Sequence, residues 1–267
     1  MRLGVLSYIN SMPLSYGLES GAAATSCEVI AGDPNCLNRL AAAGQLDVTP
    51  ISSIEFARLA GSYAMVPGFC LAAPGPVQSV RLFSRLPLGE LPGRPVAVTT
   101  ASATSRALLQ VLVPGVRVED LTGEPRLEDE QPAALLIGDR ALRGVAGAEH
   151  IYDLGELWVA ETGLPMVFAV WIASRSFLAA SPSAFEEVQA VLLRSLEWGE
   201  SHPSEVVHEA CRRTGLPAAR IENYFSALRF RLDSPAQRGL VEFFRRAAAV
   251  GLIPAEGLQL LRQPAAA

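Results

Sequence analysis

The 267-residue sequence predicts an α/β protein with two lobes, each built on a mostly parallel sheet flanked by helices. Three observations support this prediction. Short apolar stretches alternate with helix patterns over residues 2–60, a Pro- and Gly-rich stretch at 86–95 interrupts the alternation, and the pattern then restarts. After Arg175 the signals are almost entirely helical. Strands that alternate with helices typically form parallel sheets covered by helices.

The first block contains three strand–helix pairs. We expect strands at 2–8, 27–32 and 46–52, and helices at 12–21, 33–44 and 53–60. The second helix has the clearest ends. Asp33 suits its N-cap, Pro34 its first position and Gly44 its C-terminal end.

The second block repeats the alternation and leads into a helical tail. We expect strands at 77–85, 96–100, 116–120, 133–139, 166–174 and 229–233, and helices at 102–113, 140–145, 181–202, 203–213, 217–227 and 235–250, with one more starting near Leu154. The expected division places residues 1–78 and 177–267 in one lobe and 79–176 in the other. A ligand cleft is expected between the lobes, near the carboxyl ends of the strands.

The composition excludes several classes of function. All 22 basic residues are arginine, so a Schiff-base or P-loop lysine is excluded. The net charge of −5, without any basic run, argues against nucleic-acid binding. The four cysteines form no CxxC pair and the three histidines are scattered, so no metal and no cofactor are expected. With no secretory signal and no apolar run long enough to span a membrane, we expect a cytoplasmic protein that does not bind membranes.

Small polar side chains follow several of the expected strands. "SYINSMP" contributes Ser7, Asn10 and Ser11, "TPISS" Ser52, "GPVQSV" Ser79, "TTASATSR" Ser102, Thr104 and Ser105, and "LLIGDRAL" Asp139. Free N–H groups at the start of a helix, together with hydroxyls, can bind a carboxylate. Plain helix capping explains the same residues equally well, so the sequence pattern leaves both interpretations open. No GxSxG motif or dinucleotide fingerprint occurs.

Taken together, "LGVLSYINSMPLSYGLE", "GPVQSV", "TTASATSR", "LLIGDRAL" and "DLGELWVAETGLPMVFAVW" resemble the chorismate dehydratase family of the futalosine route to menaquinone. The resemblance covers about residues 2–250. It implies a type II periplasmic-binding-protein fold and the cofactor-free loss of water from the dicarboxylate chorismate, giving 3-[(1-carboxyvinyl)oxy]benzoate. The family's key asparagine falls on Asn10, and its hydroxyl-rich helix start falls on Ser102, Thr104 and Ser105. The sister branch, which forms dihydroxynaphthoate, opens with a motif closer to "SPCPNDT", and this chain lacks it.

These residues lead to a mechanistic hypothesis with stated alternatives. Asn10 is the expected catalytic residue, and it orients the substrate. The expected substrate-binding residues are Ser7, Ser11, Ser52, Ser79, Ser102, Thr104, Ser105 and Asp139. The proton is taken either by the substrate's own enolpyruvyl carboxylate or by Asp139, while lobe closure excludes water. The alternatives are a two-lobed protein that binds a small carboxylate without chemistry and the sister enzyme that forms dihydroxynaphthoate. The oligomeric state is not predicted.

Overall fold

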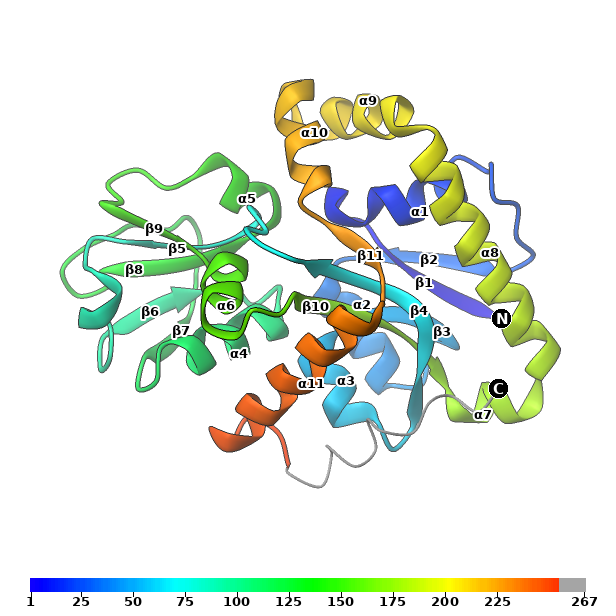
Figure 1. Ribbon diagram of the computed structural model, residues 1–267, viewed down its shortest axis with the longest axis horizontal. Coiled ribbons are helices and arrows are strands. Elements are labelled where there is room, and N and C mark those ends of the chain that lie inside the picture. The colour runs from blue at the N-terminus through cyan, green and yellow to red at the C-terminus, as the bar shows by residue number, and fades with distance from the viewer. Residues whose placement is uncertain (255–267) are drawn as a thin grey trace.

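Two sheets, each covered by helices, form the two lobes of the protein (Figure 1). The structure is a computed structural model and describes residues 1–254. The strand order is β11-β4-β10-β3-β1-β2 in the larger sheet and β7-β6-β8-β5-β9 in the smaller one. Among the described residues, no helix combines the length and the hydropathy that crossing a membrane requires.

The larger sheet mixes parallel and antiparallel strands. It contains β1 (Arg2–Leu6), β2 (Glu28–Gly32), β3 (Val48–Ser52), β4 (Tyr63–Ala73), β10 (Met166–Ser174) and β11 (Arg229–Arg231). β1 runs parallel to β2 and β3, whereas β10 runs antiparallel to β3 and β4, and β11 antiparallel to β4. The prediction of a mostly parallel sheet was therefore wrong. β4 carries the chain out to the smaller lobe and β10 brings it back, so these two neighbours run in opposite directions.

The smaller sheet is also mixed. It contains β5 (Val80–Ser84), β6 (Pro95–Val98), β7 (Arg117–Asp120), β8 (Ala133–Ile137) and β9 (His150–Asp153). β6 is parallel to β7 and β8, and β5 is antiparallel to β8 and β9. Its helices are η2 (Leu88–Glu90), α4 (Ala103–Leu112), α5 (Gly138–Arg143) and α6 (Leu154–Thr162).

The larger lobe carries the remaining helices. They are η1 (Ile9–Ser11), α1 (Met12–Glu19), α2 (Pro34–Ala42), α3 (Ser53–Leu59), α7 (Arg175–Ala180), α8 (Pro182–Ser201), α9 (Pro203–Thr214), α10 (Ala218–Ser226) and α11 (Ser234–Ala249). The predicted cap of α2 is confirmed, because Asp33 accepts a hydrogen bond from Cys36 N at 2.8 Å and Pro34 opens the helix. Gly44 follows this helix with φ +66°, a conformation that glycine adopts without a Cβ clash.

The chain passes from one lobe to the other at two neighbouring places. The outward crossing runs through residues 74–79, after β4, and the return runs through 163–165, before β10. The sequence-based division placed 166–176 in the smaller lobe, but the structure pairs β10 with β3 and β4 of the larger sheet. An apolar central strand suits either sheet, so its composition does not identify its partners. Residues 255–267, which that division assigned to the larger lobe, lie outside the described residues.

Among the strands and α-helices, three elements have no counterpart in the sequence prediction: β4, β9 and α7. β4 was hidden by Pro67-Gly68, a pair that normally marks a turn. The strand accommodates this pair in an irregularity, because its register with β10 shifts between Met65 and Cys70 and Gly68 adopts φ +89°.

One hydrophobic core continues from lobe to lobe. Ile54 of α3, Leu108 of α4 and Phe243 of α11 belong to the same cluster of buried residues. α11 contacts β10, α3 and α4, and it lies beside both lobes in Figure 1. The lobes are therefore packed against each other through α3, α4, α11 and β10.

Candidate functional site

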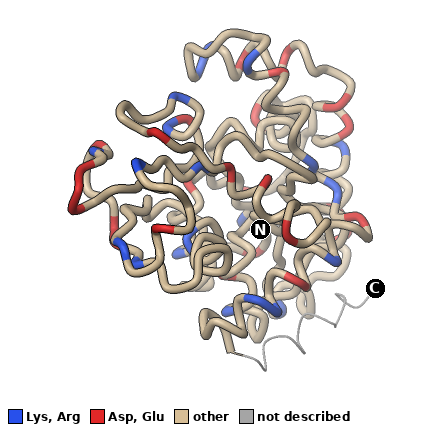
Figure 2. Tube along the Cα trace, turned by 60° about the vertical axis from the view of Figure 1, so that its left-hand side comes forward, with Lys and Arg blue, Asp and Glu red and all other residues tan. Residues whose placement is uncertain are grey.

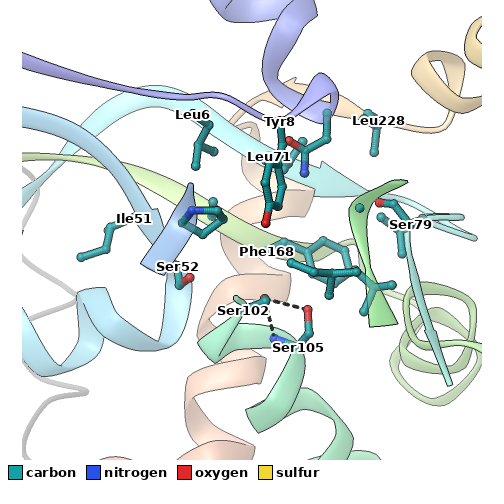
Figure 3. Close-up of a pocket in the computed structure, with 17 residues that line it drawn as sticks. Leu6, Tyr8, Ile51, Ser52, Leu71, Ser79, Ser102, Ser105, Phe168 and Leu228 are labelled. Atoms are coloured by element: carbon teal, nitrogen blue, oxygen red, sulfur yellow. Dashed lines mark hydrogen bonds between the residues drawn. The ribbon is translucent and has the colours of Figure 1, made fainter. Parts of the chain in front are cut away.

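A cavity of about 570 Å³, including its open mouth, lies between the lobes (Figure 3). Six polar residues line it: Tyr8, Asn10, Ser52, Ser79, Ser102 and Ser105. The remaining lining is mostly apolar and includes Ile51, Leu71 and Val80, with Phe168 as the second aromatic ring. We call this space the cleft cavity. Because both lobes contribute walls, its shape depends on how the lobes are placed.

Asn10 belongs to η1, the turn that joins β1 to α1. Its Oδ1 atom is buried and has no hydrogen-bond partner within residues 1–254. A buried acceptor without a partner is costly, and it is normally satisfied by water or by a ligand. Asn10 therefore has the environment expected of a ligand-binding residue.

The neighbouring serines of this motif do not line the cleft cavity. Ser11 is buried, and its hydroxyl donates to the carbonyl oxygen of Leu6 at 2.9 Å or of Tyr8 at 2.8 Å. Ser7 is exposed. Ser11 thus stabilises the turn that presents Asn10, but it does not cap α1, because its side chain makes no N-cap hydrogen bond.

The start of α4 supplies two hydroxyls from the smaller lobe. Ser102 is the N-cap: its Oγ accepts a hydrogen bond from Ser105 N at 3.2 Å and lies 2.8 Å from Ser105 Oγ (Figure 3). Ser102, which caps α4, and its hydrogen-bond partner Ser105 therefore both line the cavity as well. Thr104 instead points into the core, where its Oγ1 accepts a hydrogen bond from Ile54 N of the larger lobe at 3.2 Å. Thr104 joins the lobes and is not part of the cavity lining.

Ser52 ends β3 on the larger-lobe side of the cavity. Asn38 of α2 fixes Ser52 through two hydrogen bonds. Asn38 Nδ2 donates to Ser52 Oγ at 3.3 Å, and Asn38 Oδ1 accepts from Ser52 N at 3.3 Å. The sequence analysis missed Asn38. Its position inside a helix, away from any strand end, carries no signal of this role.

The outward crossing presents Ser79 to the cavity through a strained turn. Gln78 has φ +62°, and Ser79 N donates to the Val77 carbonyl at 2.8 Å, which closes a γ-turn. Buried Asp153 holds this turn and accepts hydrogen bonds from the N–H groups of Val77, Gln78, Gly155 and Glu156 at 2.6–3.2 Å. One carboxylate therefore caps α6 and fixes the crossing at the same time.

Asp139 lies just outside the cavity lining, next to Gly138, which does line it. Burial raises the pKa of its carboxyl, and the Arg143 charge opposes this rise. Tyr8 approaches the same point from the other lobe, because its ring lies 3.6 Å from where a Cβ of Gly138 would be. Burial raises the pKa of Tyr8, and the Asp33 and Asp139 charges add to the rise. Tyr8 therefore stays protonated, with its hydroxyl pointing toward Ser102 and Ser105 (Figure 3).

The described residues of the cavity lining include no arginine, histidine or cysteine. Arg106 pairs with Asp120, and Arg140 pairs with Glu124 at 3.3 Å; neither arginine is part of the cavity lining. Figure 2 shows acidic and basic residues interspersed along the described part of the chain. The cavity thus offers neutral hydroxyl and amide donors beside two aromatic rings, which suits a small ring that bears carboxylates.

Comparison with known proteins agrees with this geometry. Residues 1–249 match the family model described as menaquinone biosynthesis. A chorismate dehydratase of Thermus thermophilus is 33% identical, and the match covers 94% of this chain and 95% of that protein. The chain belongs to the chorismate dehydratase family of menaquinone biosynthesis. A 1,4-dihydroxy-6-naphtoate synthase of Thermus thermophilus is 26% identical, and the match covers 94% of this chain and 95% of that protein. This chain is thus similar to proteins of both branches.

Solved structures confirm the fold. A protein of Archaeoglobus fulgidus superposes with a TM-score of 0.78 at 20% identity, covering 94% of this chain and 98% of that one. The alkanesulfonate-binding protein of Xanthomonas axonopodis pv. citri, bound to MOPS, superposes with a TM-score of 0.63 at 15% identity, covering 95% and 94% of the two chains. The periplasmic aliphatic sulphonate binding protein of Escherichia coli reaches 0.64 at 16% identity, covering 98% and 99%. This family member therefore has the periplasmic-binding-protein fold.

Proposed function

We propose that the chain is a chorismate dehydratase, which removes water from chorismate to give 3-[(1-carboxyvinyl)oxy]benzoate. The unpaired Oδ1 of Asn10, in a cavity surrounded by hydroxyls from both lobes, carries the proposal. The 33% identical chorismate dehydratase supports the same reaction. Chorismate carries two carboxylates on a small ring, and these match neutral donors placed on opposite walls.

Each wall has a distinct task in this reaction. Ser102 and Ser105 bind one carboxylate at the N-terminus of α4, where free N–H groups add to their hydroxyls. Ser79 and Ser52 bind from the crossing and from the end of β3. Asn10 Oδ1 accepts a hydrogen bond from the ring hydroxyl and orients it for departure. Ser7, Ser11 and Thr104 are not part of this arrangement.

The elimination itself needs a base for the ring proton beside the departing hydroxyl. Asp139 lies outside the cavity lining, so we assign this role to the enolpyruvyl carboxylate of the substrate. The carboxylate takes the ring proton and returns it to the departing hydroxyl, so that water leaves and the proton balance is zero. The oxidation state does not change, and the aromatic ring of the product supplies the driving force. The protein therefore acts mainly by holding one geometry and excluding water.

Incubation of the purified protein with chorismate, without added metal or cofactor, tests the proposal. We expect mass spectrometry to show the loss of one water. Asn10→Ala should abolish turnover, whereas Asn35→Ala, at an exposed asparagine of α2, should leave it unchanged. Chorismate bound but returned unchanged by the folded protein would identify a binding protein instead. An Asn10→Ala variant with full kcat and weaker affinity would refute the catalytic role of Asn10.

A second variant separates the two candidate bases. Asp139→Asn keeps the size of the side chain and removes its basicity, so kcat should stay within about threefold of wild type if the substrate carboxylate is the base. A loss of about a hundredfold or more in kcat, with KM unchanged, would assign the proton to Asp139.

A further inference from the structure

Tyr224 of α10 is the one fully buried tyrosine of the described residues whose hydroxyl has no hydrogen-bond partner there. A side-chain interaction with Ser79, which lines the cavity, lowers the pKa of Tyr224 against the larger effect of burial. The two hydroxyls are therefore neighbours, but no hydrogen bond of normal distance and angle joins them. Burial and the Asp139 and Asp153 charges raise the pKa of Tyr224, so its proton stays in place.

The surroundings fix both members of this pair. Gln78 Nε2 donates to the Asn223 carbonyl at 3.1 Å, which ties α10 to the crossing that carries Ser79. Ser79 is held by its backbone on both sides: its N–H donates to Val77 and its carbonyl accepts from Gly138 N, each at 2.8 Å. The Ser79 side chain is therefore the part of this unit left to turn.

We propose that Tyr224 is a positioning residue for substrate binding: its hydroxyl donates to Ser79 Oγ when Ser79 donates its own proton to a substrate carboxylate. Ser79 Oγ then accepts from Tyr224 and donates to the carboxylate, so the two bonds form one chain and strengthen each other. The inference rests on the proposed function, since the group held at the end of the chain is a carboxylate of the substrate.

In the protein without substrate, this arrangement lowers the stability of the folded state. A fully buried hydroxyl without a partner destabilises the folded state, and phenylalanine at the same place would remove the unpaired group without leaving a cavity. A strained γ-turn next to it, with Gln78 Oε1 also buried and unpaired, adds to the cost. Unpaired buried groups that cluster beside a cavity are expected where a bound ligand completes their hydrogen bonds.

Tyr224→Phe and Tyr63→Phe form a matched pair for the test. Tyr63 is also buried, but its hydroxyl is satisfied by the carbonyls of Ala41 at 2.9 Å and Leu46 at 3.0 Å. The apparent Tm of each free variant is measured first. We expect Tyr63→Phe to fall by about 2–4 °C or more, and Tyr224→Phe to stay at or above wild type. A Tm for Tyr224→Phe as low as that of Tyr63→Phe would show that the hydroxyl is already paired and would overturn the inference.

Kinetics with chorismate provide the second readout. KM should rise about tenfold in Tyr224→Phe, equivalent to ~1.4 kcal/mol, and stay unchanged in Tyr63→Phe. An unchanged KM in Tyr224→Phe would overturn the inference. If wild type does not convert chorismate, the proposed function fails by itself, and calorimetry with the aromatic dicarboxylate isophthalate replaces the kinetics. Equal Kd values for wild type and Tyr224→Phe would then overturn the inference, and weaker binding by the variant would support it.

Discussion

The strongest test of how the crossing is held is Asp153→Asn. The Asp153 side chain is 7% exposed and accepts four backbone hydrogen bonds, three at Oδ1 and one, from Gln78 N at 2.6 Å, at Oδ2. Arg81 Nε lies 3.8 Å from Oδ2. The amide that is isosteric with this carboxylate can satisfy Oδ1 or Oδ2, but not both.

The magnitude follows from these contacts. With its oxygen kept at the Oδ1 position, the amide places an N–H group against the N–H of Gln78, so that bond is lost and two donors face each other. The other three bonds lose their charge assistance, and hydrogen bonds to charged groups are worth ~1.5–3 kcal/mol against ~0.5–1.5 kcal/mol for neutral ones. The expected loss is ~3 kcal/mol, which corresponds to a fall in Tm of about 6–12 °C for a chain of this size.

Differential scanning calorimetry of the two proteins measures this loss. Asp129→Asn is the control, because the side chain of Asp129 is 87% exposed and its single ion pair is with Arg85. The control should melt within about 1 °C of wild type. An Asp153→Asn variant that melted within about 2 °C of wild type would refute the reasoning, since the crossing would then not depend on the carboxylate.

Two further changes test other contacts. Thr104→Val removes the acceptor for Ile54 N. We expect chemical denaturation to show that the free energy of unfolding falls by ~1–2 kcal/mol relative to the exposed control Thr122→Val. KM for chorismate should stay within about twofold of wild type. A tenfold higher KM would return Thr104 to the substrate-binding set. Hydrogen bonds from Arg245, and then from Arg246, lower the pKa of Glu242 from 4.5 to about 2, so its contribution to stability is present above pH 4.5 and is lost as the pH falls toward 2. Glu242→Gln should therefore melt below wild type at pH 7 and approach it near pH 2. The same gap at both pH values, or a gap that the exposed control Glu222→Gln also shows, would contradict this assignment.

Local signals in the sequence were sufficient for most of the elements. The Asp33–Pro34 start of α2 needs only a side-chain oxygen and a fixed φ, both of which act within a few residues. The same holds for the hydroxyls of Ser102 and Ser105, whose capping role and place in the cavity coincide. A motif whose hydrogen bonds all form within a few consecutive residues can be predicted from those residues alone.

Contacts between distant segments could not be predicted in this way. β4 was missed because an irregularity, at which β4 pairs with both β10 and β11, accommodates Pro67-Gly68. Thr104 looks like its neighbouring hydroxyls in sequence, but its partner Ile54 lies 50 residues earlier, in the other lobe. Tyr224 sits in a correctly predicted helix, and nothing local indicates that the far end of its ring meets Ser79.

The two crossings have a consequence for how the site can change over generations. Residues 80–162 leave and re-enter the larger lobe next to β4 and β10, which are neighbours in one sheet, so they form an insertion with its own sheet. The insertion carries Ser102 and Ser105, whereas Asn10 and Ser52 belong to the host. Substitutions in the insertion can therefore change one wall of the cavity. The strand order of the larger sheet, which supports the other wall, is then unaffected. This chain is similar to both a dehydratase and a synthase, as expected if one scaffold can carry two different walls.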